Sequence, residues 1–264
     1  MPSFSAKDVQ KLRQLTGVGM LDAKRALEEN DGDMDRSVTW LREQGLASQA
    51  KRADREAAEG AVAIGRSGKA ASIVQLRSET DFVAKSEEFV AMVTALADLV
   101  AAEAESAVDQ KTDELDTMKI TLKENISIGT VIRIEAPDGG VIDSYLHFQA
   151  GRGVNAVVVA LDGGTEELAH DIAAHIAFAR PSYITREEVP EADVAAERET
   201  VEKIARNEGK PDAALAKIVE GRLGGWYKER VLLDQPYVKD EKQTIATLLG
   251  SATVTQFAQV VIGD

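Results

Sequence analysis

The chain has 264 residues, enough for at least two compact domains, and carries 31 Lys and Arg against 45 Asp and Glu, a formal net charge of −14 at pH 7. Its basic residues are interleaved with acids, so we expect no direct binding of nucleic acid, whose phosphates would repel such a surface. The chain contains no cysteine, which excludes disulfides, thiol catalysis and thiolate metal sites and is compatible with a cytoplasmic location. No apolar run approaches membrane-spanning length and the first residues resemble no export signal, so we expect no membrane partner.

Residues 1–46 are predicted to form a bundle of three short helices, a size and pattern similar to ubiquitin-associated domains. The first helix begins at a capping-box pair and carries apolar residues at helical spacing, Val9, Leu12 and Leu15. A second helix is predicted over Met20–Glu29, and a third ends before Gly45. The turn between the first two helices holds Val18, Gly19 and Met20. These residues either contact a partner or pack on the third helix.

Residues 47–59 are rich in alanine and in charged side chains and have too little apolar surface for a core. We predict a partly helical linker.

From residue 60 onward strands replace helices, and two units with the same order of elements follow one another. The first has strands at Ala61–Ile64 and Ala71–Leu76 and then a helix from about Phe82; the second has strands at Val141–Phe148 and Val154–Leu161 and then a helix over Glu166–Ala179. We predict a duplicated α+β core with halves at residues 60–140 and 141–264, each of which packs one helical layer on an antiparallel sheet.

The segment Ser78–Lys85 places an acid and an aromatic side by side where the first unit passes from strand to helix. The local pattern favours a capped helix start, in which Ser78 or Thr80 caps the helix and Phe82 folds back as a hydrophobic staple. The second unit has only a glycine turn at the equivalent place, residues 161–165. Because the architecture tolerates that plain turn, Asp81 and Phe82 have a second interpretation, as side chains that contact a partner.

Residues 193–230 are predicted to form a helical hairpin, an antiparallel coiled coil inserted in the second half of the core. Its apolar seam is predicted to join Val194, Val201, Ile204 and Ala205 to Leu215, Ile218, Val219 and Leu223. The hairpin either projects from the core or packs flat on its own domain. After it we expect a short helix near Thr244–Leu249 and a closing strand over Thr253–Ile262 that completes the core sheet.

The sequence shows no convincing set of catalytic residues. His170 and His175 are five residues apart, which does not place two ligands on one helical face, so we interpret them as surface or packing residues. The glycine pairs near residues 151 and 163 lack the spacing of a phosphate-binding loop. We therefore expect a protein that is not an enzyme and that holds no cofactor and no metal.

Two motifs identify a family. Leu12–Leu27 and Glu79–Lys85 resemble the amino-terminal and central signatures of the elongation factor Ts family, in the same order and at a similar distance. Further likeness, at Gly209–Pro211, Val219–Arg222 and Gln235–Val238, extends the resemblance over nearly the whole chain. Gln75 and Arg77 depart from it, since a glutamate and an asparagine are expected in the run before the central signature.

The resemblance implies a guanine-nucleotide exchange factor that binds elongation factor Tu in its GDP form and promotes release of GDP. It implies a wedge that displaces the partner's magnesium and opens its nucleotide pocket, formed by Thr80, Asp81, Phe82 and Val83. Further partner contacts are expected from Val18, Gly19, Met20 and His147. The helical hairpin is expected to project and could join two copies into a homodimer. The alternative is a scaffold that holds partners without changing nucleotide affinity; an acidic enzyme is less favoured.

Overall fold

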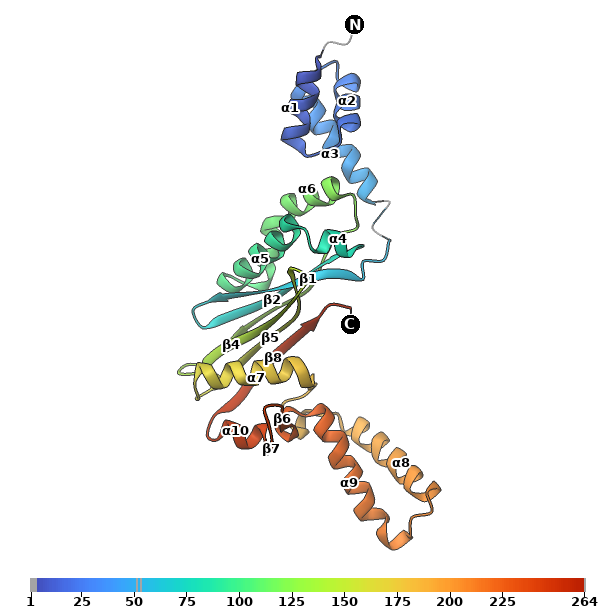
Figure 1. The fold of residues 1–264 in the computed structure, drawn as a ribbon, viewed down its shortest axis with the longest axis vertical. Helices are drawn as coiled ribbons and strands as arrows, with labels where there is room; N and C mark the ends of the chain where they lie inside the picture. Colours follow the sequence, from blue (N-terminus) through green and yellow to red (C-terminus); the bar gives the residue numbers. More distant parts are fainter. Residues whose placement is uncertain (1–3, 51, 53, 264) are drawn as a thin grey trace.

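The structure is a computed structural model that describes residues 4–50, 52 and 54–263. Figure 1 shows an elongated molecule, with a helical bundle at one end, two sheets in the middle and a helical hairpin at the other end. The order of these parts follows the chain, as the sequence analysis expects.

The N-terminal bundle contains α1 (Ala6–Thr16), α2 (Met20–Glu29) and α3 (Met34–Ala50). The capping box is present, since the backbone N–H of Ser5 donates to the carboxylate of Asp8 at 2.7 Å, and Gly17 ends α1 in a left-handed conformation. The apolar faces of the helices meet in a small core of Val9, Leu12, Val18, Ala23, Ala26, Leu27 and Leu41.

The third helix is longer than predicted. Gly45 does not end α3, which continues to Ala50, so the predicted linker over residues 47–59 begins inside this helix. Residues 51 and 53 of that linker lie outside the described residues. Gly45 has a packing role instead: a Cβ atom there would lie 2.6 Å from the side chain of Ile120, so only glycine lets α3 pass this close to the core.

The first half of the core is an antiparallel sheet in the order β1-β2-β3, covered on one face by helices. Its elements are β1 (Glu59–Ser67), β2 (Ala70–Ser78), α4 (Asp81–Ala84), α5 (Glu87–Ala102), the 3₁₀ helix η1 (Glu105–Lys111), α6 (Thr112–Leu122) and β3 (Ser127–Glu135). The single helix predicted from Phe82 is divided, because Ser86 caps a new helix by accepting from the N–H of Phe89 at 3.4 Å. Strand β3 was not predicted.

The second half repeats the hairpin and helix, which confirms the predicted duplication. It consists of β4 (Val141–Gln149), β5 (Arg152–Asp162), α7 (Glu166–Ala179) and the closing strand β8 (Thr253–Val261). The sheet order is β4-β5-β8, so the last strand completes the second sheet as predicted.

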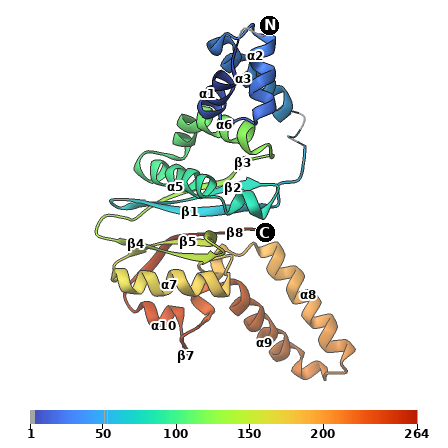
Figure 2. The same cartoon turned by 45° about the horizontal axis from the view of Figure 1, so that its top comes forward.

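The two sheets pack face to face, with α5 and α6 on the outer side of the first and α7 on the outer side of the second (Figures 1 and 2). A core of small and β-branched side chains fills the space between the sheets, including Val62, Ile73, Ile134, Val158 and Val260. The approach is close at Gly153, where a Cβ atom would lie 2.3 Å from the carbonyl oxygen of Val62. At the same end, buried Arg152 donates to the carbonyl of Gly60 at 2.6 Å and to the carboxylate of Glu59 at 2.7 Å, which links the two sheets.

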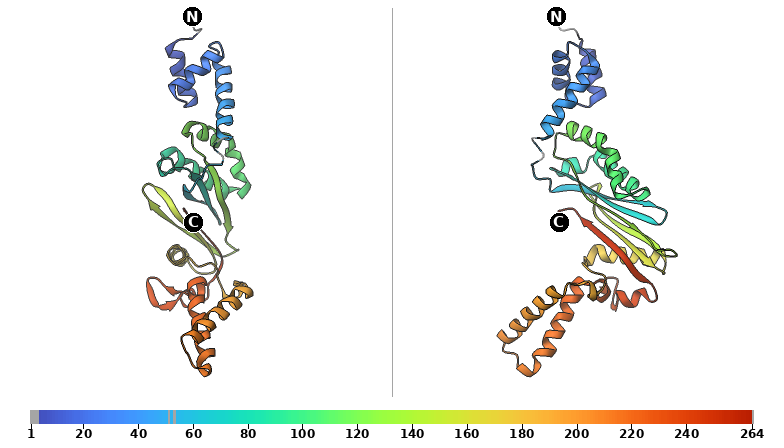
Figure 3. Two further views of the ribbon diagram at one scale, coloured as in Figure 1. Left: turned by 90° about the vertical axis from the view of Figure 1, so that its right-hand side faces the viewer. Right: turned by 180° about the vertical axis from the view of Figure 1, so that it is seen from behind.

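The helical hairpin projects from the second half, so the interpretation of a hairpin packed flat is wrong (Figures 1 and 3). It consists of α8 (Glu191–Asn207) and α9 (Asp212–Arg230). Most of the predicted seam is confirmed by burial of Val201, Ala205, Leu215, Val219 and Leu223. Ile204 does not belong to the seam: its side chain is 43% exposed and lies on the outer face of α8.

Short elements connect the hairpin to the core. They are η2 (Arg186–Glu188), η3 (Leu232–Asp234), β6 (Pro236–Tyr237), β7 (Asp240–Thr244) and α10 (Ile245–Leu249), the last of which was predicted. Across the part of the chain that the structure describes, no helix combines the length and apolar character needed to cross a membrane.

Candidate protein-binding corner

The corner between β2 and α4 is a tightly hydrogen-bonded turn. Thr80 is the N-cap of α4, since its hydroxyl accepts from the backbone N–H of Val83 at 3.3 Å. Ser78 is not the cap; it is buried at the end of β2, and its hydroxyl donates to the carbonyl of Thr80 at 3.1 Å. The predicted alternative of a Ser78 cap is therefore wrong, because this residue still belongs to the strand.

Two glutamates hold the corner from both sides. The carboxylate of Glu124 accepts from the backbone N–H groups of Glu79 at 3.0 Å and Thr80 at 3.1 Å, and also from the Thr80 hydroxyl. In return, the carboxylate of Glu79 accepts from the backbone N–H of Asn125 at 2.6 Å. Sequence analysis missed Glu124 and Asn125, because neither the spacing nor the local pattern relates them to a motif so far away in the chain.

Asp81 is the first residue of α4 and carries a charged carboxylate. Lys85 lies one turn later, and its ammonium group is 2.5 Å from the Asp81 carboxylate. This hydrogen bond is the main reason that the pKa of Asp81 lies below its usual value, and the positive charges of Lys85 and Arg152 lower the pKa further. At neutral pH the corner therefore presents an ionised carboxylate that is half-exposed and paired with Lys85.

Phe82 points away from the protein, with 84% of its surface exposed. The hydrophobic staple is therefore wrong. The next two residues turn inward, since Ala84 is buried and Val83 packs against the core of the first half. A helix of four residues thus anchors one face in the core and presents an acid and an aromatic on the other.

His147 lies at the same end of the molecule as the corner. It is exposed at the end of β4, opposite Asn155, in the hairpin whose Arg152 reaches the first residues of β1. Those residues pair with the end of β2, where the corner begins. The neighbouring Phe148 is 61% exposed, a second aromatic at this end that the sequence analysis did not single out.

The predicted contacts in the bundle divide into two groups. Val18 is buried in the core of the bundle together with Leu41 of α3, which agrees with the packing interpretation of that residue. Gly19 is exposed, Met20 is 50% exposed and the following Leu21 is 82% exposed. The turn therefore packs on α3 through one residue and presents the next three outward.

The two histidines of α7 make contacts within the protein. His175 is buried and bonds through Nε2 to the side-chain oxygen of Gln235 at 2.9 Å, a packing role as predicted. His170 is at the surface, 3.3 Å from the carboxylate of Asp143. Within the described residues, no group of three or more acidic, histidine or cysteine side chains could hold a metal ion.

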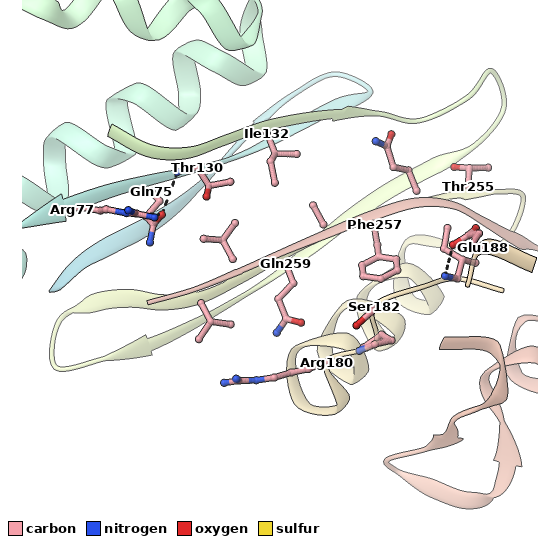
Figure 4. A pocket seen from close by; sticks show the side chains of 16 residues that line it. Gln75, Arg77, Thr130, Ile132, Arg180, Ser182, Glu188, Thr255, Phe257 and Gln259 are labelled. Carbon is pink, nitrogen blue, oxygen red and sulfur yellow. Dashed lines mark hydrogen bonds between the residues drawn. The ribbon is translucent and has the colours of Figure 1, made fainter. Parts of the chain in front are cut away.

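A cleft of about 570 Å³ runs between β3, β8 and residues 180–188 (Figure 4). Two of its polar side chains bond within the protein: Glu188 accepts from the N–H of Ile184 at 2.7 Å, and Gln75 accepts from the N–H of Thr130 at 3.2 Å. The described lining contains no histidine that could activate its serine or threonine hydroxyls. Gln75 and Arg77, the two departures from the family pattern, lie here and not at the corner.

A rigid corner that presents an aromatic and a charged acid to solvent is typical of a protein that acts by contact with another protein. A sequence model of the family described as elongation factor TS matches residues 79–264, which begin at the corner and include β3 of the first sheet, the whole second sheet and the hairpin. The chain is 43% identical to elongation factor Ts of Kineococcus radiotolerans and 43% identical to that of Mycolicibacterium smegmatis, with all of both chains covered in each comparison. It is 38% identical to elongation factor Ts of Deinococcus deserti, over 97% of this chain and 99% of that one.

The chain therefore belongs to the elongation factor Ts family. Members of this family bind elongation factor Tu and act as its nucleotide exchange factors in translation elongation; they are not enzymes. The relatives match the chain from end to end, so the likeness includes the N-terminal bundle, which lies before the residues that the family model matches.

Proposed function

We propose that this chain releases GDP from elongation factor Tu by inserting Asp81 and Phe82 of the corner beside the bound nucleotide. The observation that carries the proposal is the exposure of Phe82 on a corner whose backbone is held by the carboxylate of Glu124. An exposed aromatic costs free energy in water and gains it when a partner covers it, so its natural place is inside a complex.

Exchange needs no bond to be made or broken. A factor that binds the nucleotide-free partner more tightly than the nucleotide-bound partner must, by linkage, weaken nucleotide binding by the same factor. A difference of about 1.4 kcal/mol between the binding free energies for the two forms of the partner changes the affinity for nucleotide tenfold. Phe82 would favour the nucleotide-free form of the partner by wedging between elements that must separate for the nucleotide pocket to open.

Asp81 supplies the electrostatic part of the proposal. Its carboxylate is ionised at neutral pH, and a carboxylate near the partner's magnesium competes for the water and ligands around that ion. Thr80 caps the turn and Val83 anchors it, so these two residues set the direction in which Asp81 and Phe82 point.

Further contacts are proposed at both sides of the corner. His147 is exposed at the same end of the core and would touch the partner beside Phe82. In the bundle, Gly19 and Met20 are accessible, whereas buried Val18 would act by shaping the turn. A role in translation agrees with the cytoplasmic location expected from the sequence.

Stopped-flow release of a fluorescent GDP analogue from elongation factor Tu tests the proposal. The wild-type chain should accelerate release, while Asp81→Ala with Phe82→Ala should slow it by roughly two orders of magnitude, about 2.7 kcal/mol. Phe178→Ala is the matched control, because Phe178 is also exposed, at 78%, but lies on α7. Binding without acceleration by the wild type would instead support the scaffold alternative, and a double variant as fast as the wild type would exclude the wedge.

We also propose that two copies associate through the helical hairpin. The apolar side chain of Ile204 supports this, since it is 43% exposed on the projecting hairpin. Sedimentation equilibrium of the free chain should then show a dimer that Ile204→Glu converts to a monomer. A monomeric wild type at all concentrations would refute this association.

A further inference from the structure

A three-residue turn touches both of the surfaces proposed to bind the partner. Lys123, Glu124 and Asn125 follow the end of α6 at Leu122 and precede β3, and we name them the junction turn. Lys123 has a left-handed backbone conformation, with φ of 59°, which ends the helix and changes the direction of the chain. The junction turn belongs to no motif of the sequence.

One side of the junction turn contacts the N-terminal bundle. The ammonium group of Lys123 lies 2.9 Å from the carboxylate of Asp22, which directly follows the exposed Leu21. The preceding helix supports this contact, since Asp113 of α6 pairs with Arg42 of α3 at 2.6 Å. Ile120 of α6 packs against α3 at Gly45. The bundle is thus seated on α6 beside its own exposed apolar residues.

The other side holds the corner. Glu124 binds three donors of Glu79 and Thr80, and Asn125 donates its backbone N–H to the carboxylate of Glu79. The side-chain amide of Asn125 also donates to the carbonyl of Arg55 at 2.7 Å, in the segment that joins bundle and core. Three consecutive residues therefore bond to the bundle, the corner and the connecting segment.

A helix as short as α4 does not hold its own conformation in water, because nucleation of a helix costs more than its few hydrogen bonds return. Thr80 contributes one cap, but the N–H groups of Glu79 and Thr80 lie before the helix and need another acceptor. A charged carboxylate that accepts several backbone N–H groups is a strong one. Glu124 therefore determines how rigidly Asp81 and Phe82 are presented.

From this arrangement we infer that the junction turn fixes the bundle and the corner as one partner-binding surface, and that Glu124 is the positioning residue for Asp81 and Phe82. The inference rests on the proposed function. A rigid wedge spends none of its binding free energy on becoming ordered, so more remains to distort the partner. When the bundle is held in place on α6 and binds the partner, it keeps the corner close to the same partner molecule, which raises the effective concentration of the corner.

The two sides of the junction turn predict different kinetic effects. Loss of Glu124 loosens the wedge, so the GDP release rate at saturating factor falls while the half-saturating concentration changes little. Loss of the Lys123 contact frees the bundle, so the half-saturating concentration rises while the saturated rate stays the same. A residue needed only for folding would not separate the two parameters.

The experiment measures GDP release from elongation factor Tu over a range of concentrations of the full chain. Glu124→Ala is expected to lower the saturated rate roughly tenfold, and Glu124→Gln, which keeps an acceptor oxygen, to restore most of it. Lys123→Glu is expected to raise the half-saturating concentration about threefold, because an exposed ion pair is weak, and Asp22→Lys in the same chain to reverse the change. Glu114→Ala is the matched control, an α6 carboxylate paired with Lys111 away from the corner.

Thermal unfolding of each variant is recorded in parallel. Glu124→Ala with a wild-type saturated rate would overturn the positioning role, and so would a loss of rate that follows the melting temperature and is not restored in Glu124→Gln. A Lys123→Glu variant with an unchanged half-saturating concentration would overturn the coupling to the bundle. The variant with both Asp81→Ala and Phe82→Ala is measured in the same series: if it matches the wild type, the proposed wedge fails on its own, whatever the junction variants show.

Discussion

Two phenylalanines near the start of the first core helices have opposite surroundings. Phe89 is completely buried between α5 and the first sheet, whereas Phe82 is 84% exposed on α4. A new helix begins after Ser86 and separates them. In one continuous helix, two residues seven positions apart would lie on the same face, and Phe82 would be directed inward with Phe89. One residue type is therefore buried in the core at one position and exposed, at the proposed contact with the partner, at the other.

We predict that stability and exchange respond oppositely to these two residues. Phe82→Ala should change the free energy of unfolding by no more than about 0.5 kcal/mol, since no packing is lost. Phe89→Ala should lower it by about 3–5 kcal/mol through the cavity that it leaves. Urea denaturation measures both values. A large destabilisation by Phe82→Ala would show that its side chain packs on the protein in solution.

His175 is a buried imidazole that suits only the neutral form. Its Nε2 faces the oxygen of Gln235, and its Nδ1 accepts the backbone N–H of Val238 at 3.4 Å. Burial lowers the pKa of His175 below its usual value of 6.5, while the bond to Gln235 opposes the shift. A proton on Nδ1 would face another donor, so the folded protein resists protonation.

This predicts a loss of stability in mild acid. Below about pH 6.5 the unfolded chain binds a proton at His175 that the folded chain excludes. The contribution of neutral His175 to the free energy of unfolding is therefore complete above that pH. It declines as the pH falls towards the lower pKa of the folded state. Melting temperatures between pH 7.5 and 5.5 should show the decline, and His175→Gln should flatten it. His170→Gln, at the surface, is the control; an equal flattening there would assign the effect to the wrong residue.

At the scale of elements, single glycines set how closely the layers approach. Gly65 of β1 lies against α5, where a Cβ atom would be 2.1 Å from the carbonyl oxygen of Ala97. The same carbonyl accepts from the hydroxyl of buried Ser72 at 2.6 Å, which ties β2 to this point of the helix. The helix cannot move away without breaking that bond.

We therefore expect Gly65→Ala to destabilise the protein by about 1–3 kcal/mol, the usual result of overpacking. Gly68→Ala is the comparison in the adjacent hairpin turn: it has open space around it, and its positive φ of 58° is the main cost there. Chemical denaturation of both variants distinguishes steric overlap from backbone strain. A neutral Gly65→Ala would mean that α5 can shift outward.

At the scale of the molecule, burial decreases from the sheets towards the two ends. Strand β5 has an unbroken run of buried residues, Ala156 to Leu161, between the facing sheet and α7. The hairpin α8–α9 buries only a narrow seam, in which Val201, Val219 and Leu223 form one small cluster. Local opening should therefore cost much less in the hairpin than in the sheets.

Hydrogen exchange followed by mass spectrometry tests this gradient. Amides of β5 should exchange only through global unfolding, and those of α8 and α9 through local opening with much lower protection. Val219→Ala should speed exchange in both hairpin helices and leave β5 unchanged. Equal protection of hairpin and sheet would show that the molecule unfolds as one unit.

Much of this architecture follows from apolar periodicity, and the parts that do not follow have physical reasons. The helical spacing of Phe89, Val93 and Leu96 agrees with their burial on one face of α5, and the repeat predicted both hairpins. Strand β3 was missed because its side chains are half-buried along most of its length, and its place is set by pairing with β2. Gly45 was interpreted as a helix end because its packing partner, Ile120, is distant in the sequence.

The residues of the candidate site were also predicted only in part from the sequence. Comparison of the two halves indicated that Phe82 was not needed by the fold, and its exposure confirms that it is not a staple. Glu124 had no local signal, because its bonds to Glu79 and Thr80 cross the whole of α5 and α6. The motif locates the residues that we propose to meet a partner, while Glu124, which holds that motif, is found only in the structure.

The pairing of β8 with β5 has a consequence for the order of events during synthesis. All three strands of the first sheet are present once residue 135 has been made, but the second sheet waits for residues 253–261, the last strand of the chain. Until then one edge of β5 and the apolar face beneath it lack their cover, and such exposed strands aggregate readily. A nascent chain of this protein therefore carries half of its core unfinished until β8 has been made, and truncation before β8 should yield insoluble fragments.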